Sequence, residues 1–191
     1  MGVTVVHTTL TKHILGAIDL TGPPGPPASR DRLVGAALPL RLGRAADDGG
    51  GTEQAPRVLV PAEQLATAAA ERVAGLLDDP MAFGIGPGRT PAPLSPWKAG
   101  SKPVELKTTG INITLDRTST AQPTPVLVVL AGSDGDQTLT GEVTEITLVG
   151  QVFAGRKLTT IGVALKADAW YTVLTLAAGW HGRLEALRAT S

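Results

Sequence analysis

Cysteine is absent from the 191-residue sequence, and several kinds of chemistry are excluded with it. The chain can form no disulfide, no thiolate nucleophile and no zinc or iron–sulfur centre held by cysteine. No motif for any other cofactor or metal is present, so we expect none to be bound.

Aromatic residues are also scarce, with three Trp, two Phe and one Tyr in the whole chain. Surfaces that bind sugars or single-stranded nucleic acid rely on exposed aromatic faces for stacking. The candidates for stacking on a ligand are Trp180 and Tyr171, with Trp97 as a third. We expect Trp180 to be the most exposed of these, because Gly179, His181 and Gly182 surround it.

The sequence has no excess of charge and no long apolar run. Seventeen basic and seventeen acidic residues cancel, and the basic ones are scattered, so neither nucleic acid nor a membrane is predicted as a partner. No stretch has the length and apolar character of a membrane span, and the N-terminus lacks the pattern of a secretory signal. We expect synthesis in the cytoplasm and leave the destination open, an assembled particle included.

What the sequence has in abundance is β-strand pattern, between residues 102 and 179. Runs rich in Val, Ile, Leu and Thr follow one another and are broken mainly by Gly, Pro and Asp. We therefore predict a mainly β fold, an antiparallel β-sandwich or barrel with its core at 104–180. Residues 125–130 (PVLVVL) are apolar at every position, which predicts a central strand buried on both faces.

Two changes of phase interrupt the apolar alternation, near Gly110 and near Thr144–Glu145. Side chains of a strand alternate strictly, so each change requires either a bulge, for which Gly110 is well suited, or a break in the strand. The Asp-Gly pair within residues 132–136 predicts a hairpin turn. These irregularities favour a bent, two-layered or closed sheet.

One packed α-helix is predicted at about 61–78, within a segment 61–79. Pro61 suits its first turn, and Pro80 would end it. Apolar residues at three- and four-residue spacing form a single stripe: Ala62, Leu65, Ala69, Val73, Leu76 and Leu77. Residues 1–60 are expected to form N-terminal strands with a proline-rich arm at 21–30, and residues 181–191 a short helix-like tail.

Residues 80–103 form a connector rich in Pro and Gly. A connection this long without regular structure is unusual inside a compact domain and is often functional. Apolar residues recur along it, and we expect them to dock on a partner: Met81, Phe83, Ile85, Leu94 and Trp97.

Several short motifs have a functional and an ordinary interpretation. Residues 84–89 (GIGPGR) are rich in glycine but lack the Lys-Ser/Thr of a phosphate-binding loop. Asp134 and Asp136 could begin a calcium site, but the liganding Glu of a full loop is missing. His7, His13 and His181 show no spacing typical of a shared metal. The ordinary interpretation, turns and unrelated side chains, is favoured for each.

No catalytic set stands out. There is no G-x-S-x-G elbow, and Glu142 and Glu145 lie in a Thr-rich setting that predicts solvated carboxylates with ordinary pKa values. Asn112 begins a match to the glycosylation pattern, which without a secretion signal indicates an ordinary strand residue. We therefore assign no catalytic and no metal-binding residue and predict that the chain is not an enzyme.

The first functional hypothesis is a structural subunit of a larger particle, such as a virion, phage tail or tail-like assembly. Its arms would dock on copies of itself and on other structural proteins. The alternative is a surface-binding or adhesion module, with carbohydrate as a possible ligand. A second alternative, an enzyme whose site is built from loops, has no residue pattern in its favour.

Overall fold

The computed structural model describes residues 2–19, 28–42, 57–118, 122–132 and 144–191. Over these residues the chain is mainly β, and its sheets are antiparallel. No sheet closes into a barrel in this part of the chain. The sole α-helix among the described residues, α1 (Arg30–Leu33), is a single turn. The prediction of a mainly β, antiparallel protein is confirmed.

The strands of the described residues form three larger sheets and two hairpins. The N-terminal sheet has the order β2-β1-β5, with β1 at Gly2–Thr8, β2 at Ile14–Asp19 and β5 at Leu65–Glu71. The four-stranded sheet has the order β11-β10-β13-β14, with β10 at Thr124–Gly132, β11 at Thr144–Val152, β13 at Trp170–Ala177 and β14 at Arg183–Arg188. The β12-β9-β8 sheet has β8 at Val104–Lys107, β9 at Gly110–Thr114 and β12 at Leu158–Gly162.

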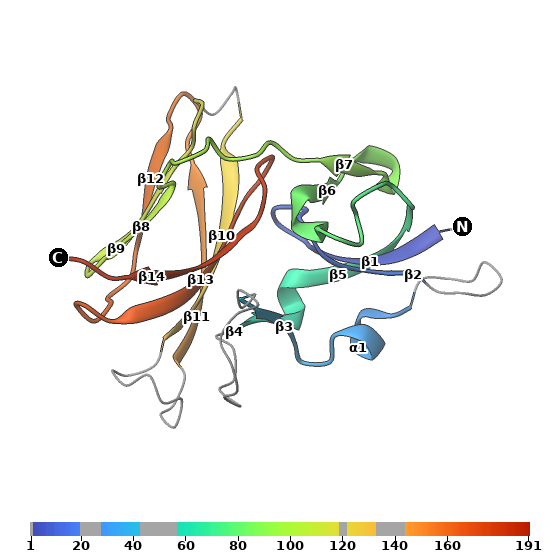
Figure 1. Ribbon diagram of the computed structural model, residues 1–191, viewed down its shortest axis with the longest axis horizontal. Coiled ribbons are helices and arrows are strands. Elements are labelled where there is room, and N and C mark those ends of the chain that lie inside the picture. The colour runs from blue at the N-terminus through green and yellow to red at the C-terminus, as the bar shows by residue number, and fades with distance from the viewer. Residues whose placement is uncertain (1, 20–27, 43–56, 119–121, 133–143) are drawn as a thin grey trace.

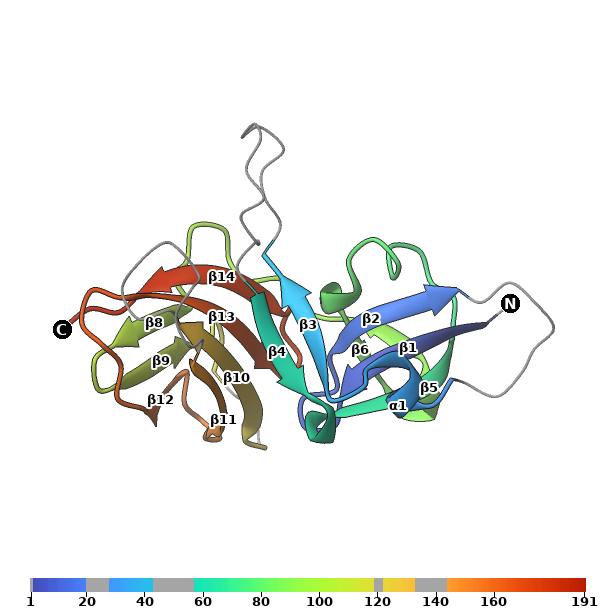
Figure 2. The same ribbon diagram turned by 90° about the horizontal axis from the view of Figure 1, so that it is seen from below.

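The two hairpins and three short 3-10 helices make up the rest of the regular structure in the described ranges. They are β3 (Ala37–Arg41) with β4 (Arg57–Pro61), β6 (Phe83–Ile85) with β7 (Pro91–Pro93), η1 (Ala62–Gln64), η2 (Pro80–Ala82) and η3 (Pro87–Arg89). Figure 1 shows the strands from β8 to β14 gathered on one side of the molecule and the N-terminal sheet with β6 and β7 on the other. The β3–β4 hairpin lies between these two parts (Figure 2).

Strand β10 is the centre of the hydrophobic core, as its sequence predicts. It pairs with β11 on one side and β13 on the other, and its residues from Val126 to Gly132 are all buried. Val126, Val128 and Leu130 face a cluster shared with β8 and β9. The residues between them, Leu127, Val129 and Ala131, face a second cluster. Val58 and Val60 of β4 belong to this second cluster. Because both faces are covered, the strand is apolar at every position instead of alternating.

The predicted helix at about 61–78 is wrong. Residues 62–64 form η1, and β5 then pairs antiparallel with β1 along its whole length. The small alanines of β5 suit this arrangement, since Ala68 and Ala70 are buried against a third cluster with Val3 and Val5. Gly75 follows in a left-handed conformation, with φ of 80°, which no helix could accommodate.

The change of phase at Gly110 is a strand break. Lys107 pairs with Gly110 across a hairpin between β8 and β9, so the two apolar phases belong to two strands. Gly110 is required for another reason: a Cβ there would lie 2.8 Å from the carbonyl oxygen of Ile161 on β12. The second change of phase falls where β11 begins, and the predicted turn at 132–136 lies almost entirely outside the described residues, as does most of the arm at 21–30.

Two segments contain more regular structure than their sequences predict. The connector at 80–103 contains η2, η3 and the β6–β7 hairpin. The expected helix-like tail instead provides β14, which pairs with β13 from Trp170 to Thr175. In both cases a strand pairs with its neighbour in sequence, β6 with β7 and β14 with β13. This pairing, and not the propensity of each segment taken alone, determines the conformation.

Candidate functional site

A cluster of buried polar residues surrounds His13, which lies directly before β2 and is fully buried. Its Nε2 atom lies 2.7 Å from the carbonyl oxygen of Trp180, and its Nδ1 atom lies 2.9 Å from the hydroxyl of Thr11. Lys12 has a φ of 64°, so a left-handed residue in the β1–β2 turn directs the chain back towards β1. His13 therefore joins the N-terminal sheet to the C-terminal part of the molecule.

The hydrogen-bond partners determine where the protons lie. The Trp180 carbonyl only accepts, so His13 Nε2–H donates to it and Nδ1 accepts from the Thr11 hydroxyl. Thr8 donates to Thr11 at 2.7 Å and accepts from the backbone N–H of His13 at 3.1 Å. Each hydroxyl donates once and accepts at least once, so the network is satisfied when His13 is neutral.

Burial also keeps His13 neutral. It lowers the pKa of His13 from 6.5 to about 4, against the raising effect of hydrogen bonds to the backbone of Trp180 and of Thr11. The neighbouring His181 adds a small lowering effect. Burial lowers the pKa of His7 as well, and the positive charges of Lys12 and Arg89 act in the same direction.

This arrangement resembles that of a catalytic nucleophile. The Thr11 hydroxyl has the place of the nucleophile, His13 that of the base, and the Trp180 carbonyl that of the group that orients the base. Thr8 is 0% and Thr11 is 2% exposed. In this conformation no substrate can reach either hydroxyl, so the arrangement acts as a structural junction. Neither threonine was predicted from the sequence, although their place between two histidines in HTTLTKH is a signal that could have indicated them.

A pair of stacked tryptophans lies beside this junction. The rings of Trp97 and Trp180 are 5.0 Å apart at an interplanar angle of 25°, and the Arg117 guanidinium lies 5.0 Å from the centre of the Trp180 ring. Trp97 donates from Nε1 to the carbonyl oxygen of His181 at 2.8 Å. Trp180 is only 6% exposed, so the expectation that it is the exposed aromatic is wrong. The flanking glycines serve a tight turn, in which Gly179 has φ of 86°.

Tyr171, the other stacking candidate, is half-buried and also packs within the chain. Its hydroxyl accepts a hydrogen bond from the backbone N–H of Lys166 at 3.0 Å. A Cβ on Gly132 would lie 2.4 Å from its ring, so the ring covers that glycine closely. A role in ligand stacking stays a prediction for both Tyr171 and Trp180.

The five residues expected to dock on a partner are half-buried against their own chain. Met81 packs on the cluster that includes Val58, while Phe83 and Ile85 pack on the cluster around Val3. Leu94 donates its backbone N–H to the carbonyl oxygen of Ala82. Trp97 packs on the apolar cluster to which β8 and β9 contribute. Their role towards a partner remains a prediction.

The remaining sequence candidates lie apart from one another. Gly84 faces Leu94, whose side chain would be 3.0 Å from a Cβ, so close packing explains this glycine without a phosphate. Asn112 accepts a hydrogen bond from Thr160 at 2.8 Å. Burial raises the pKa of Glu145, contrary to the expectation of an ordinary carboxylate, while a hydrogen bond from Leu59 and the charge of Arg57 act in the opposite direction. Asp134, Asp136 and Glu142 lie outside the described residues.

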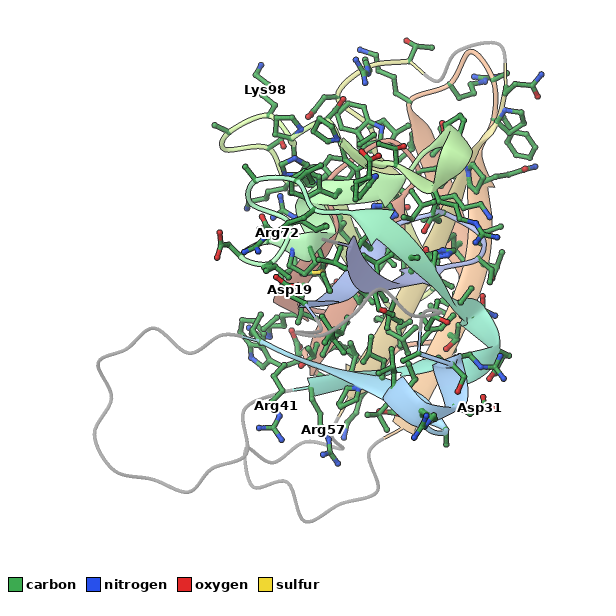
Figure 3. The ribbon with its side chains drawn as sticks, turned by 90° about the vertical axis from the view of Figure 1, so that its right-hand side faces the viewer. Asp19, Asp31, Arg41, Arg57, Arg72 and Lys98 are labelled. Atoms are coloured by element: carbon green, nitrogen blue, oxygen red, sulfur yellow. The ribbon has the colours of Figure 1, made fainter. Side chains whose placement is uncertain are left out.

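Ion pairs and an open hollow lie on the surface of the described part of the chain. Arg72 bonds Asp19 at 2.9 Å and so links the two edges of the N-terminal sheet (Figure 3). An open hollow of about 400 Å³ lies between η2, the end of β3 and the start of β14. Arg41 and Asp79 line it together with Arg183 and Glu185, which pair with each other at 2.8 Å.

Within the described ranges, no group of three or more metal-ligating side chains converges, and no helix has the length and apolar character to cross a membrane. Comparison of the chain with protein-family models, with curated proteins and with solved structures finds no match in any of the three.

Proposed function

We propose that this protein is a non-enzymatic structural subunit of a larger assembly, of the kind found in virions, phage tails or tail-like particles. Its neighbours would be copies of itself and other structural proteins. The observation that carries the proposal is a set of large apolar side chains, each more than half exposed, on the C-terminal sheets and their turns: Val149, Phe153, Leu158 and Trp170.

The exposure of these side chains is stronger evidence for a binding surface in this chain than it would be in most proteins. Phe153 and Trp170 are each 59% exposed, in a sequence with only two Phe and three Trp. Single exposed aliphatic residues are ordinary, but aromatic residues are enriched where proteins bind one another. Contacts with other protein subunits would cover these side chains.

The non-enzymatic part of the proposal is supported by how the reactive side chains are used. His13 and Thr11 hold a buried junction, and His181 donates from Nε2 to the carbonyl oxygen of Leu94 at 3.0 Å. Trp97 and Trp180 stack on each other. These groups connect parts of the same chain, which suits a rigid building block.

A β-sandwich is the architecture that we propose for the C-terminal part. Side chains of β8 and β9 share one apolar cluster with side chains of β10, β11 and β13. Two sheets that share a core in this way are typical of sandwiches. Such a layer would present its outer faces and its edge strands to neighbouring subunits.

The native mass of the purified chain, and of any complex isolated with it, tests the proposal. We expect a mass well above the 19.6 kDa of one chain, falling when Phe153 and Trp170 are both replaced by Ser. As a matched control, Arg156→Ser in the same turn as Phe153 should leave the mass unchanged. A protein that stays monomeric at every concentration and captures no other subunit contradicts the proposal, as does glycan binding that depends on Trp97.

A further inference from the structure

Strand β12 differs from the other edge strands of the larger sheets. Among these strands in the described part of the chain, it alone contains neither a charged residue nor a proline. The others contain at least one charge each: Asp19 in β2, Glu71 in β5, Glu105 in β8, Glu145 in β11 and Arg183 in β14. Charges and prolines on edge strands prevent pairing with another chain, and β12 (LTTIG) has no such protection.

The backbone groups of β12 that face outward can be identified from its ladder with β9. Leu115 donates to Lys157 at 2.7 Å at one end, and Val163 donates to Thr109 at 3.3 Å at the other. Hydrogen-bonded pairs alternate in an antiparallel ladder. Residues 159 and 161 therefore bond to β9, whereas Leu158, Thr160 and Gly162 direct their N–H and C=O groups away from it.

We propose that a second copy of this chain binds here, with the two β12 strands antiparallel about a two-fold axis at Thr160. In this register Thr160 pairs with its own equivalent, and Leu158 pairs with Gly162 of the second copy. Every outward N–H and C=O group of the strand then finds a partner. The β12-β9-β8 sheet continues through the interface into the same sheet of the second copy.

The side chains and charges fit the same register. Leu158 is 53% exposed, and no atom lies within 4 Å of where a Cβ on Gly162 would be. Leu158 of one copy can therefore cover Gly162 of the other. Lys157 comes opposite Val163, and Arg156 opposite Ala164, so the basic residues at this end meet no like charge.

This inference rests on the proposed function and names one contact of the assembly. A single pair of five-residue strands makes a small interface, so the isolated dimer should be weak and depend on concentration. Within a particle, other contacts to the same neighbours would strengthen it.

Sedimentation equilibrium from low micromolar to millimolar concentration tests the pairing. We expect a monomer–dimer equilibrium whose dissociation constant rises at least tenfold in Thr160→Pro. The N–H of Thr160 points away from β9, so proline removes an intermolecular donor and leaves the ladder within the subunit intact. Thr160→Val retains the N–H and should dimerise like the wild type. Gly162→Lys, which fills the space needed by Leu158 of the second copy, should weaken the dimer independently.

Circular dichroism of each variant shows whether the fold is retained. A chain that is monomeric at all concentrations overturns the inference, as does a dimer that tolerates both Thr160→Pro and Gly162→Lys. The proposed function fails separately: a dimer that both variants weaken, with no larger assembly at any concentration and no other subunit captured, supports pairing through β12 while it contradicts that function.

Discussion

His13 Nε2 lies 2.7 Å from the carbonyl oxygen of Trp180, a residue 167 positions later in the chain. This hydrogen bond joins the turn after β1 to the turn before β14. It requires a proton on Nε2, and the Thr11 hydroxyl, 2.9 Å from Nδ1, holds the ring in that form. Protonating Nδ1 would reverse one bond of the network and leave the hydroxyl hydrogen of Thr11 without its acceptor.

Stability should therefore fall in acid. The pKa of His13 is lowered from 6.5 to about 4, so the unfolded chain takes up a proton over a pH range in which the folded chain does not. Above about pH 6.5 His13 is neutral in both states, and its contribution to the free energy of unfolding is complete. As the pH falls towards 4, protonation of the unfolded chain lowers the free energy of unfolding by up to about 3 kcal/mol. Urea denaturation at several pH values measures it. His13→Gln retains a donor for Trp180, and its stability should depend less on pH; an unchanged profile contradicts the assignment.

Removing the hydroxyl at the centre of the network should destabilise the protein at neutral pH. Thr11→Val leaves Nδ1 of His13 without a donor and the hydroxyl hydrogen of Thr8 without an acceptor in a buried site. We expect a loss of about 1–3 kcal/mol in the free energy of unfolding, measured by urea denaturation. Thr11→Ser keeps the hydroxyl and should lose much less. A larger loss in Thr11→Ser than in Thr11→Val would show that packing of the methyl group matters more than the hydrogen bonds.

The fold was predictable from sequence where local pattern and tertiary environment agree. Val126–Leu130 is apolar at every position because both faces of β10 are covered. The predicted helix shows the opposite case. Its stripe consists largely of Ala and Leu, which fit a helix or a buried strand, and the choice depends on β1, about sixty residues earlier.

The candidate site was less predictable than the fold. The three histidines were visible in the sequence, but the partner of His13 is a backbone carbonyl, which any residue could provide. The exposure of Trp180 was misjudged because its cover, Trp97 and Arg117, comes from segments more than sixty residues away. Contacts of this kind leave no local signal.

Replacing a strand glycine with alanine should cost much more stability at position 132 than at position 162. A Cβ on Gly132 would lie 2.4 Å from the Tyr171 ring, which is anchored through its hydroxyl to the backbone of Lys166. Gly132→Ala should therefore cost about 1–3 kcal/mol of stability. Gly162→Ala, where nothing lies within 4 Å, should change it by less than about 0.5 kcal/mol. Thermal denaturation of the two variants tests the order, and similar melting temperatures would contradict it.

The tryptophan stack should contribute to stability, whereas the exposed tryptophan should not. Trp97→Ala removes the ring that stacks 5.0 Å from Trp180 and the hydrogen bond to His181. We expect a loss of about 3 kcal/mol in the free energy of unfolding. Trp170 is 59% exposed, so Trp170→Ala should cost less than about 0.5 kcal/mol in the monomer and serves as the matched control. Urea denaturation followed by circular dichroism measures both variants, because the fluorescence of each is altered by the substitution itself. If Trp170→Ala is the more destabilising change, that side chain packs within its own chain, and the case for a partner surface there is lost.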